Sequence, residues 1–183
     1  MAGKVSAAKP KTGGGLYVGP TTATLPTSTD GTMTGFTSMG NVSDNGVENN
    51  MTKESEDFKA WGGDTVGSAQ TSSEDSYALT LLDSTSVDVL KEVYGADNVT
   101  GTLSTGITIK KNAKEKVERA WIIDMVLADG ILKRIVVPRG KITEIGTVAY
   151  RDNEPIGYEI TIQAYPDASG NTGYEYIKEP SAS

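Results

Sequence analysis

The sequence predicts a mainly β protein, an antiparallel β-sandwich or half-barrel of about seven or eight strands with one short flanking α-helix. Three observations support this fold class. Short stretches of alternating apolar residues recur along the chain, turn-forming Asx-Gly pairs separate them, and one segment has helical periodicity. The length of 183 residues suits one domain. We therefore expect a β-sandwich domain over residues 31–166, between a flexible N-terminal arm (1–30) and a C-terminal arm (167–183).

The N-terminal arm is rich in Gly, Thr, Ser, Pro and Lys, and its main apolar cluster is Leu16, Tyr17 and Val18. Such a segment buries too little apolar surface to become ordered by itself, which favours a flexible terminus. The alternative is an arm that becomes ordered against a neighbouring subunit, where Leu16, Tyr17 and Val18 add a short strand to a sheet edge.

The first hairpin is predicted at Asn45-Gly46, a pair typical of a tight type I′ turn. Its arms then run through residues 35–44 and 47–61. The second arm is strongly acidic and places Glu54 and Glu56 on one face, so it lies in solvent or faces a polar interior. The next strand, over residues 76–82, carries its apolar side chains on one face, namely Tyr77, Leu79 and Leu81.

A helix of about 8 to 10 residues is predicted near residues 85–94. Thr85 is the expected N-cap, Asp88 completes a capping-box-like pair, and Gly95 ends the helix. The apolar stripe consists of Val87, Leu90, Val93 and Tyr94.

The strongest hairpin covers Trp121 to Val137 and turns at Asp129-Gly130. Counting outward from the turn gives the expected pairs Ala128–Ile131, Leu127–Leu132, Met125–Arg134 and Ile123–Val136. Both faces are largely apolar, so we expect this hairpin to be covered on two sides. Pro138 is expected to end it, because proline cannot donate a hydrogen bond to a strand ladder.

Two further strands are expected at residues 141–150 and 156–165. The second has a clear apolar face, made of Ile156, Tyr158, Ile160, Ile162 and Ala164. In the C-terminal arm, Tyr174, Tyr176 and Ile177 are the apolar residues, and they form either a short terminal strand or a second arm.

Composition excludes several classes of function. The net charge of −7 argues against an open basic surface that holds nucleic acid. The chain contains no cysteine and no histidine, which removes thiolate chemistry, histidine-based catalysis and the common zinc sites. No segment has the roughly 20 apolar residues of a membrane span or a signal-peptide pattern, so we expect a protein made in the cytoplasm without a membrane partner.

Acidic clusters at residues 54–57 and 74–75 are the natural places to look for paired carboxylates, but a sequence with 24 acidic residues always contains such clusters. Neither an EF-hand nor a phosphate-binding loop is present. We therefore assign no catalytic, cofactor-binding or metal-binding residues and expect no enzyme. Trp61 and Trp121 are expected to be core or interface anchors.

Residues 40–95 resemble the major tail tube proteins of siphophages that infect Gram-positive bacteria. The resemblance lies in Val42-Ser43-Asp44-Asn45-Gly46-Val47, in residues 58–66 (FKAWGGDTV), in residues 71–83 (TSSEDSYALTLLD) and in residues 90–95 (LKEVYG). Residues 118–165 are similar to the closing strands of that family.

The resemblance implies a structural virion protein rather than an enzyme. It implies a β-sandwich with a flanking helix, six copies in a ring, and rings stacked into a hollow tube around a tape-measure protein. Other expected partners are the tail terminator and the distal tail protein. The resemblance further implies that viral DNA passes through the lumen without specific binding, and that the tail is assembled in the cytoplasm of the host. The resemblance brings no catalytic or cofactor site.

Two hypotheses follow for individual segments. Glu54 and Glu56 are expected to face the lumen, although a plain solvated hairpin explains them equally well. The terminal arms, with Leu16, Tyr17 and Val18, are expected to contact neighbouring subunits. The alternatives for the whole chain are another virion component, such as a tail terminator or head decoration protein, a carbohydrate-binding β-sandwich, or a glycosidase with two carboxylates.

Overall fold

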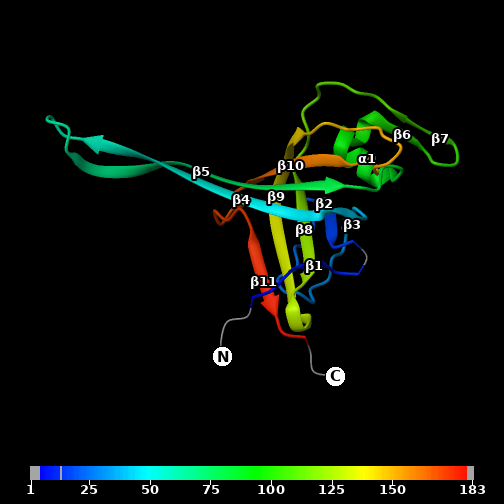
Figure 1. The fold of residues 1–183 in the computed structure, drawn as a ribbon, viewed down its shortest axis with the longest axis horizontal. Helices are drawn as coiled ribbons and strands as arrows, with labels where there is room; N and C mark the ends of the chain where they lie inside the picture. Colours follow the sequence, from blue (N-terminus) through cyan, green and yellow to red (C-terminus); the bar gives the residue numbers. More distant parts are fainter. Residues whose placement is uncertain (1–4, 13, 181–183) are drawn as a thin grey trace.

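The computed structural model describes residues 5–12 and 14–180 as a mainly β, antiparallel protein with one α-helix (Figure 1). The strands are β1 (Lys9–Pro10), β2 (Leu16–Pro20), β3 (Thr37–Ser38), β4 (Val42–Lys59), β5 (Thr65–Leu81), β6 (Val99–Thr102), β7 (Gly106–Ile109), β8 (Arg119–Val126), β9 (Leu132–Ile145), β10 (Tyr158–Tyr165) and β11 (Tyr174–Lys178). The helix is α1 (Val87–Tyr94), and two 3₁₀ turns cover Ala96–Asn98 and Asp129 with its neighbours. The predicted fold class is confirmed.

Strands β8 and β9 are shared by two parts of the main sheet. The sheet runs in the order β3-β2-β8-β9-β10-β5-β4, while β1 also pairs with β8 and β11 also pairs with β9. Each of the two central strands therefore changes partner along its length. In Figure 1, β8 and β9 cross the direction of β10, β5 and β4, so the open sheet folds over its own core.

The core lies where these two parts of the sheet and helix α1 meet. Its largest fully buried side chains include Trp121, Leu81, Ile160 and Ile162. Residues 120–124 of β8 are all buried, so both faces of the β8–β9 hairpin are covered, as predicted. The expected apolar faces of β5 and β10 are also confirmed, because Tyr77, Leu79, Leu81, Tyr158, Ile160, Ile162 and Ala164 are all buried.

Helix α1 has the predicted position, with a different N-cap. Ser86 occupies the cap position, and its side chain makes no capping hydrogen bond, so the expectation for Thr85 was wrong. Gly95 ends the helix with φ +98° and donates its backbone N–H to the carbonyl of Lys91 at 2.8 Å. Of the predicted apolar stripe, Leu90 and Val93 are buried, whereas Val87 and Tyr94 are only partly buried. Val89, which the prediction left out, is buried as well.

The predicted turn at Asn45-Gly46 was wrong. Gly46 has φ +73°, but β4 continues through it, and the pairing with β5 shifts between Val42 and Val47. The pair therefore forms a bulge inside one long strand. The chain reverses instead at residues 60–64, where Gly62 and Gly63 have positive φ and the N–H of Ala60 donates to the carbonyl of Asp64 at 2.8 Å.

The hairpin at Asp129-Gly130 has the predicted turn with a register shifted by one residue. Both turn residues have positive φ, as a type I′ turn requires. The observed pairs are Val126–Leu132, Met125–Lys133, Asp124–Arg134 and Ile123–Ile135, in place of the predicted set. Ala128 is left out of the ladder, which moves every partner by one position.

Pro138 does not end a strand, which corrects the expectation. It lies inside β9, within a bulge where residues 138 and 139 face Ala120 of β8, and between the ladders that β9 makes with β11 and β10. No neighbouring strand needs a hydrogen bond from the missing N–H at this point. The separate strand expected at residues 141–150 is therefore absent, because residues 141–145 are the end of β9. The strand expected at residues 156–165 is present as β10, which begins at Tyr158.

Candidate functional site

The most unusual feature is a projecting ribbon, defined as residues 52–74, in which β4 and β5 pair only with each other. Asp75 is the last residue of β5 that pairs with β10, and all pairs beyond it join β4 to β5. Figure 1 shows the ribbon extending far from the body. Almost all of its residues are exposed, so it has no core of its own.

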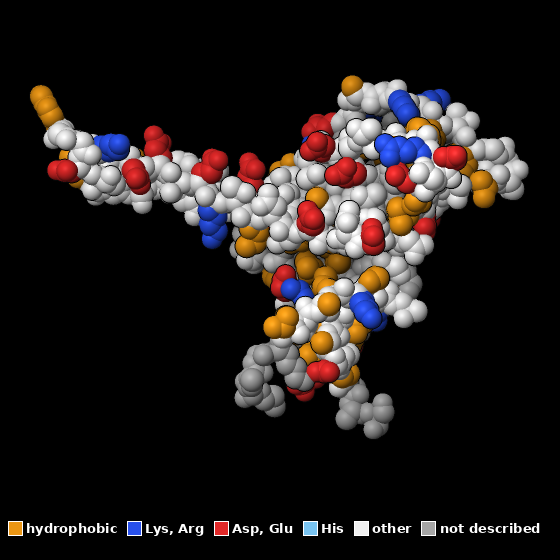
Figure 2. All heavy atoms as spheres, viewed as in Figure 1, with side chains coloured by type: hydrophobic (Ala, Val, Ile, Leu, Met, Phe, Trp, Pro, Cys, Tyr) orange, Lys and Arg blue, Asp and Glu red, His pale blue; other side chains and the backbone are white. Residues whose placement is uncertain are grey.

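The end of the ribbon carries apolar side chains in solvent (Figure 2). Trp61 lies in the turn and is fully exposed, and Phe58 and Val66 are more than half exposed. Trp121, in contrast, lies in the core with 1% of its surface exposed. The expectation of a core or interface anchor thus holds for Trp121 in the core, whereas Trp61 has no contact partner within the body of its own chain.

Glu54 and Glu56 belong to a larger acidic sheet face, which also includes Glu48, Glu74, Glu144 and Glu159. The register places these six side chains on the same side of β4, β5, β10 and β9. Glu48 pairs with Ala78, Ala78 with Thr161, and Thr161 with Glu144, which gives one row across the four strands. All six glutamates are exposed.

The residues between these glutamates are small or polar, such as Ser72, Ala69 and Ser76. Figure 2 shows acidic side chains along the ribbon and over the adjoining body. Sequence alternation along β4 could place Glu48, Glu54 and Glu56 on one face, but the other three members depend on strand pairing.

Positive charges lie away from the acidic sheet face or are already paired. Lys53 and Lys59 alternate onto the opposite face of the ribbon. Lys141 of β9 lies opposite Gln163, on the same side as the glutamates, but it forms an ion pair with Glu115. Arg139, two residues earlier, is paired with Glu118. The acidic sheet face therefore keeps a strong negative potential.

Leu16, Tyr17 and Val18 form strand β2, which pairs with β8 of the same chain. Leu16 and Val18 are buried in the core, and Tyr17 is the one of the three that is partly exposed. Their predicted contact with a neighbouring subunit stays a prediction.

A buried ion pair holds the segment that follows β2. Arg134 donates from Nε and Nη2 to the carboxylate of Asp124, at 2.5 and 2.7 Å, and both side chains are buried. Its Nη1 donates to the carbonyls of Ser28 and Gly31 at 3.0 and 2.8 Å. One guanidinium therefore links β8, β9 and the loop between β2 and β3.

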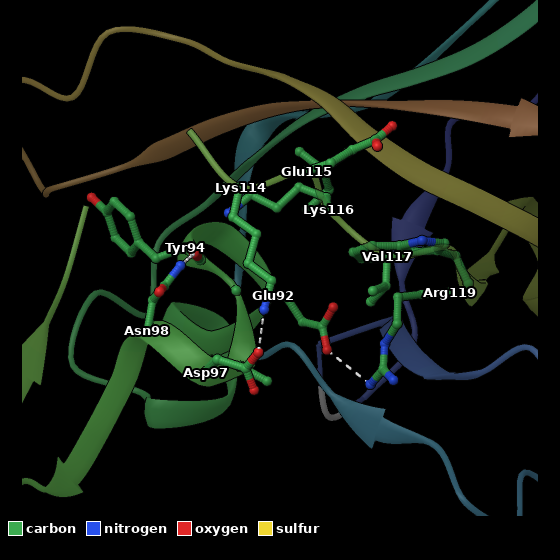
Figure 3. A pocket seen from close by; sticks show the side chains of 13 residues that line it. Glu92, Tyr94, Asp97, Asn98, Lys114, Glu115, Lys116, Val117 and Arg119 are labelled. Carbon is green, nitrogen blue, oxygen red and sulfur yellow. Dashed lines mark hydrogen bonds and ion pairs between the residues drawn. The ribbon is translucent and has the colours of Figure 1, made fainter. Parts of the chain in front are cut away.

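A small pocket lies between α1 and the segment before β8 (Figure 3). Its volume is about 140 Å³. Glu92 pairs with Arg119 at 2.9 Å, and Lys114 with Asp97 at 2.6 Å. Burial raises the pKa of Glu92, and the charge of Arg119 opposes this shift. The charged groups form ion pairs with one another. The pocket beside the helix therefore offers no free pair of carboxylates.

Within residues 5–12 and 14–180, no group of three acidic side chains is arranged to hold a metal ion. The one α-helix in this part of the chain is far too short to span a membrane.

Comparison with known proteins identifies the family. The family model described as "Phage tail tube protein" matches residues 5–183, which is nearly the whole chain. No curated protein matches the sequence. The matched family is structural and is not known for enzymatic activity. The chain therefore belongs to the phage tail tube protein family, as a component of the virion tail that assembles with further copies and other tail components into a tube.

Proposed function

We propose that the protein polymerises as stacked hexameric rings into the hollow tail tube, which conducts viral DNA into the host. The acidic sheet face is the observation that carries this proposal. Double-stranded DNA carries about one negative charge per 1.7 Å, so a wall of carboxylates repels the polymer and prevents it from adhering. The small polar residues between the glutamates add few groups that hold a passing strand.

The ribbon supports assembly between copies. A two-stranded hairpin is marginally stable in water when it packs against nothing. The exposed Trp61, Phe58 and Val66 would gain from burial against a second copy. Such a contact joins two different surfaces and repeats from one subunit to the next, as a tube requires. Six copies in a ring is what the resemblance to siphophage tube proteins implies.

The proposed partners are further copies of the chain, the tape-measure protein inside the tube, and the tail terminator and distal tail protein at its ends. Assembly takes place in the host cytoplasm. We also propose that the N-terminal segment contacts a neighbouring subunit. Within Leu16–Val18, Tyr17 would make this contact, because its side chain is partly exposed. Leu16 and Val18 are buried within their own chain.

Electron microscopy of the purified protein over a range of concentrations tests the function directly. We expect hollow tubes whose end views have sixfold symmetry. Single rings that never stack would indicate a terminator-like component. A protein that stays monomeric at every concentration, with and without the other tail components, would overturn the proposal.

Neutralising Glu54 and Glu56 tests the lumen position of the acidic sheet face. We expect the double variant Glu54→Gln, Glu56→Gln to form normal tubes but to eject DNA several-fold more slowly at low salt, because DNA adheres more readily to the less charged wall. The difference should disappear near 1 M salt, where the screening length falls to about 3 Å. Ejection kinetics of reconstituted phage provide the measurement.

The matched control removes two acidic groups of the ribbon that lie outside that face, with Asp57→Asn and Asp64→Asn. Asp57 pairs with Ser68 on the opposite face, and Asp64 lies in the turn. We expect ejection by this control to match that of the parent phage. Equal ejection kinetics for parent, test and control variants at low salt would remove Glu54 and Glu56 from the lumen wall.

A further inference from the structure

A buried carboxylate lies at the root of the projecting ribbon. Asp75 pairs with Ala164 of β10 on one side and with Met51 of β4 on the other, and the next residue outward pairs with β4 alone. Asp75 therefore marks the point where the ribbon leaves the body. Its side chain is 6% exposed, although the residues that follow it toward the turn are almost all in solvent.

Three different segments donate hydrogen bonds to Asp75. Asn49 Nδ2 donates to Oδ1 at 2.6 Å, and Thr172 Oγ1 donates to Oδ2 at 2.8 Å. The side-chain amide of Gln163 donates to its backbone carbonyl at 3.1 Å. These donors come from β4, from the loop before β11, and from β10. No cation in the described part of the chain forms an ion pair with Asp75.

Burying a charge without a counter-ion costs free energy. If packing were the only requirement, an apolar residue at this position would make the fold more stable. A carboxylate, however, accepts short and directional hydrogen bonds that are about twice as strong as those between neutral groups. Both of its oxygens are used, and they fix β5 relative to two segments that are distant in sequence. We infer that Asp75 sets the direction in which the ribbon projects from the body.

A small change of angle at Asp75 produces a large displacement at the end of the ribbon. A strand of ten residues, such as residues 65–74 of β5, extends about 33 Å at ~3.3 Å per residue. A rotation of about 10° at the root would move the end of such a strand by about 6 Å, which is larger than the spacing between neighbouring strands. Two-stranded ribbons twist easily, and among the described residues no strand of the body pairs with this one beyond Asp75. A defined direction would let Trp61 reach the same place on each neighbouring copy, a consequence that rests on the proposed function.

The absence of cysteine from the chain allows a direct test on the monomer. Spin labels are attached to Asp64→Cys in the turn and to Glu144→Cys on β9, and the distance between them is measured by electron paramagnetic resonance. We expect a narrow distance distribution in the parent and a distribution several-fold wider after Asp75→Ala. Thr172→Val, which removes one hydroxyl, should give an intermediate width.

Two controls separate positioning from a general loss of structure. Asp75→Asn should keep a narrow distribution, since its amide still accepts from Asn49 and the hydroxyl of Thr172 can reverse and accept. Glu74→Ala, one residue away on the solvent face, should not change the width. Circular dichroism verifies that each variant is folded, and Thr172→Val carries the test if Asp75→Ala does not fold. The inference would be overturned if folded Asp75→Ala or Thr172→Val gave a distance distribution with the same width and mean as the labelled protein without these changes.

Tube formation is measured separately with the unlabelled variants. Loss of tubes in Asp75→Ala together with a wider distribution supports both the inference and the role of the ribbon in assembly. A wider distribution with normal tubes supports the inference and removes the ribbon from the assembly contact. Failure of the parent protein itself to form tubes counts against the proposed function, while the distance measurement still decides the role of Asp75.

Discussion

Replacing Arg134 by Met is expected to lower the free energy of unfolding by about 3–5 kcal/mol, the usual cost of removing one partner of a buried ion pair. Asp124 would remain buried with only Lys11 near it, a partly exposed side chain whose Nζ lies 4.0 Å away. The carbonyls of Ser28 and Gly31 would lose their donor. Urea unfolding followed by circular dichroism gives the change in free energy. The loop between β2 and β3 should also become more accessible to proteases.

Arg139 on the same strand provides the matched control. It pairs with Glu118 at the surface, so Arg139→Met should cost no more than about 1 kcal/mol. In the double variant Asp124→Leu, Arg134→Met, neither member of the ion pair is left as a buried charge, and we expect part of the loss to be recovered. If Arg134→Met were as stable as Arg139→Met, the buried pair would have no special role in holding the subunit together.

Replacing Trp121 by Ala is expected to destabilise the subunit by about 3–5 kcal/mol, the range observed when a large buried aromatic residue is truncated. The indole fills the centre of the core, and its Nε1 donates to the carbonyl of Gly140 at 3.3 Å. There is little room for the core to rearrange, because a β-carbon added at Gly140 would lie 2.7 Å from the indole. Thermal and urea unfolding of the monomer measure the effect.

Replacing the other tryptophan, Trp61, by Ala is expected to have little effect on the stability of the monomer. Its side chain is fully exposed in the monomer, so the change should alter monomer stability by no more than about 0.5 kcal/mol. If the end of the ribbon is buried in the tube, the variant should need a higher protein concentration to polymerise. An unchanged polymerisation threshold would show that Trp61 stays exposed in the tube as well.

The parts of the fold that the sequence predicts well are those where one face is buried and the other is not. The alternation in β10 and at the inner end of β5 is of this kind. The stripe of α1 was predicted only in part, since it missed the buried Val89. A one-residue shift in such a strand would expose its apolar residues, so the pattern determines which side faces the core.

Where both faces are apolar, this information is lost. A shift of one residue between β8 and β9 leaves both faces of the hairpin largely apolar, so the pattern does not select one register. The count from Asp129-Gly130 also assumed a turn without a bulge. The information that determines the register lies in Asp124 and Arg134. An acid and a base within two apolar strands are best placed opposite each other, and this pairing alone gives the observed register.

The turn at Asn45-Gly46 failed for a different reason. The positive φ that favours Asn-Gly in a type I′ turn also occurs in a bulge, so the local preference was satisfied without a reversal. Gly62-Gly63 was an equally good turn signal farther along the chain. The long ribbon and the full acidic sheet face could not be anticipated, since both depend on which strands lie beside one another.

The shared central strands also determine when the subunit can complete its fold. Leu16 pairs with Ile123, about a hundred residues later, and β9 receives its last partner only with Tyr174–Lys178. Pairings between such distant segments are slow to form. A nascent chain therefore lacks a finished sheet until residues 174–178 have left the ribosome, so the subunit completes its fold only after that segment has emerged.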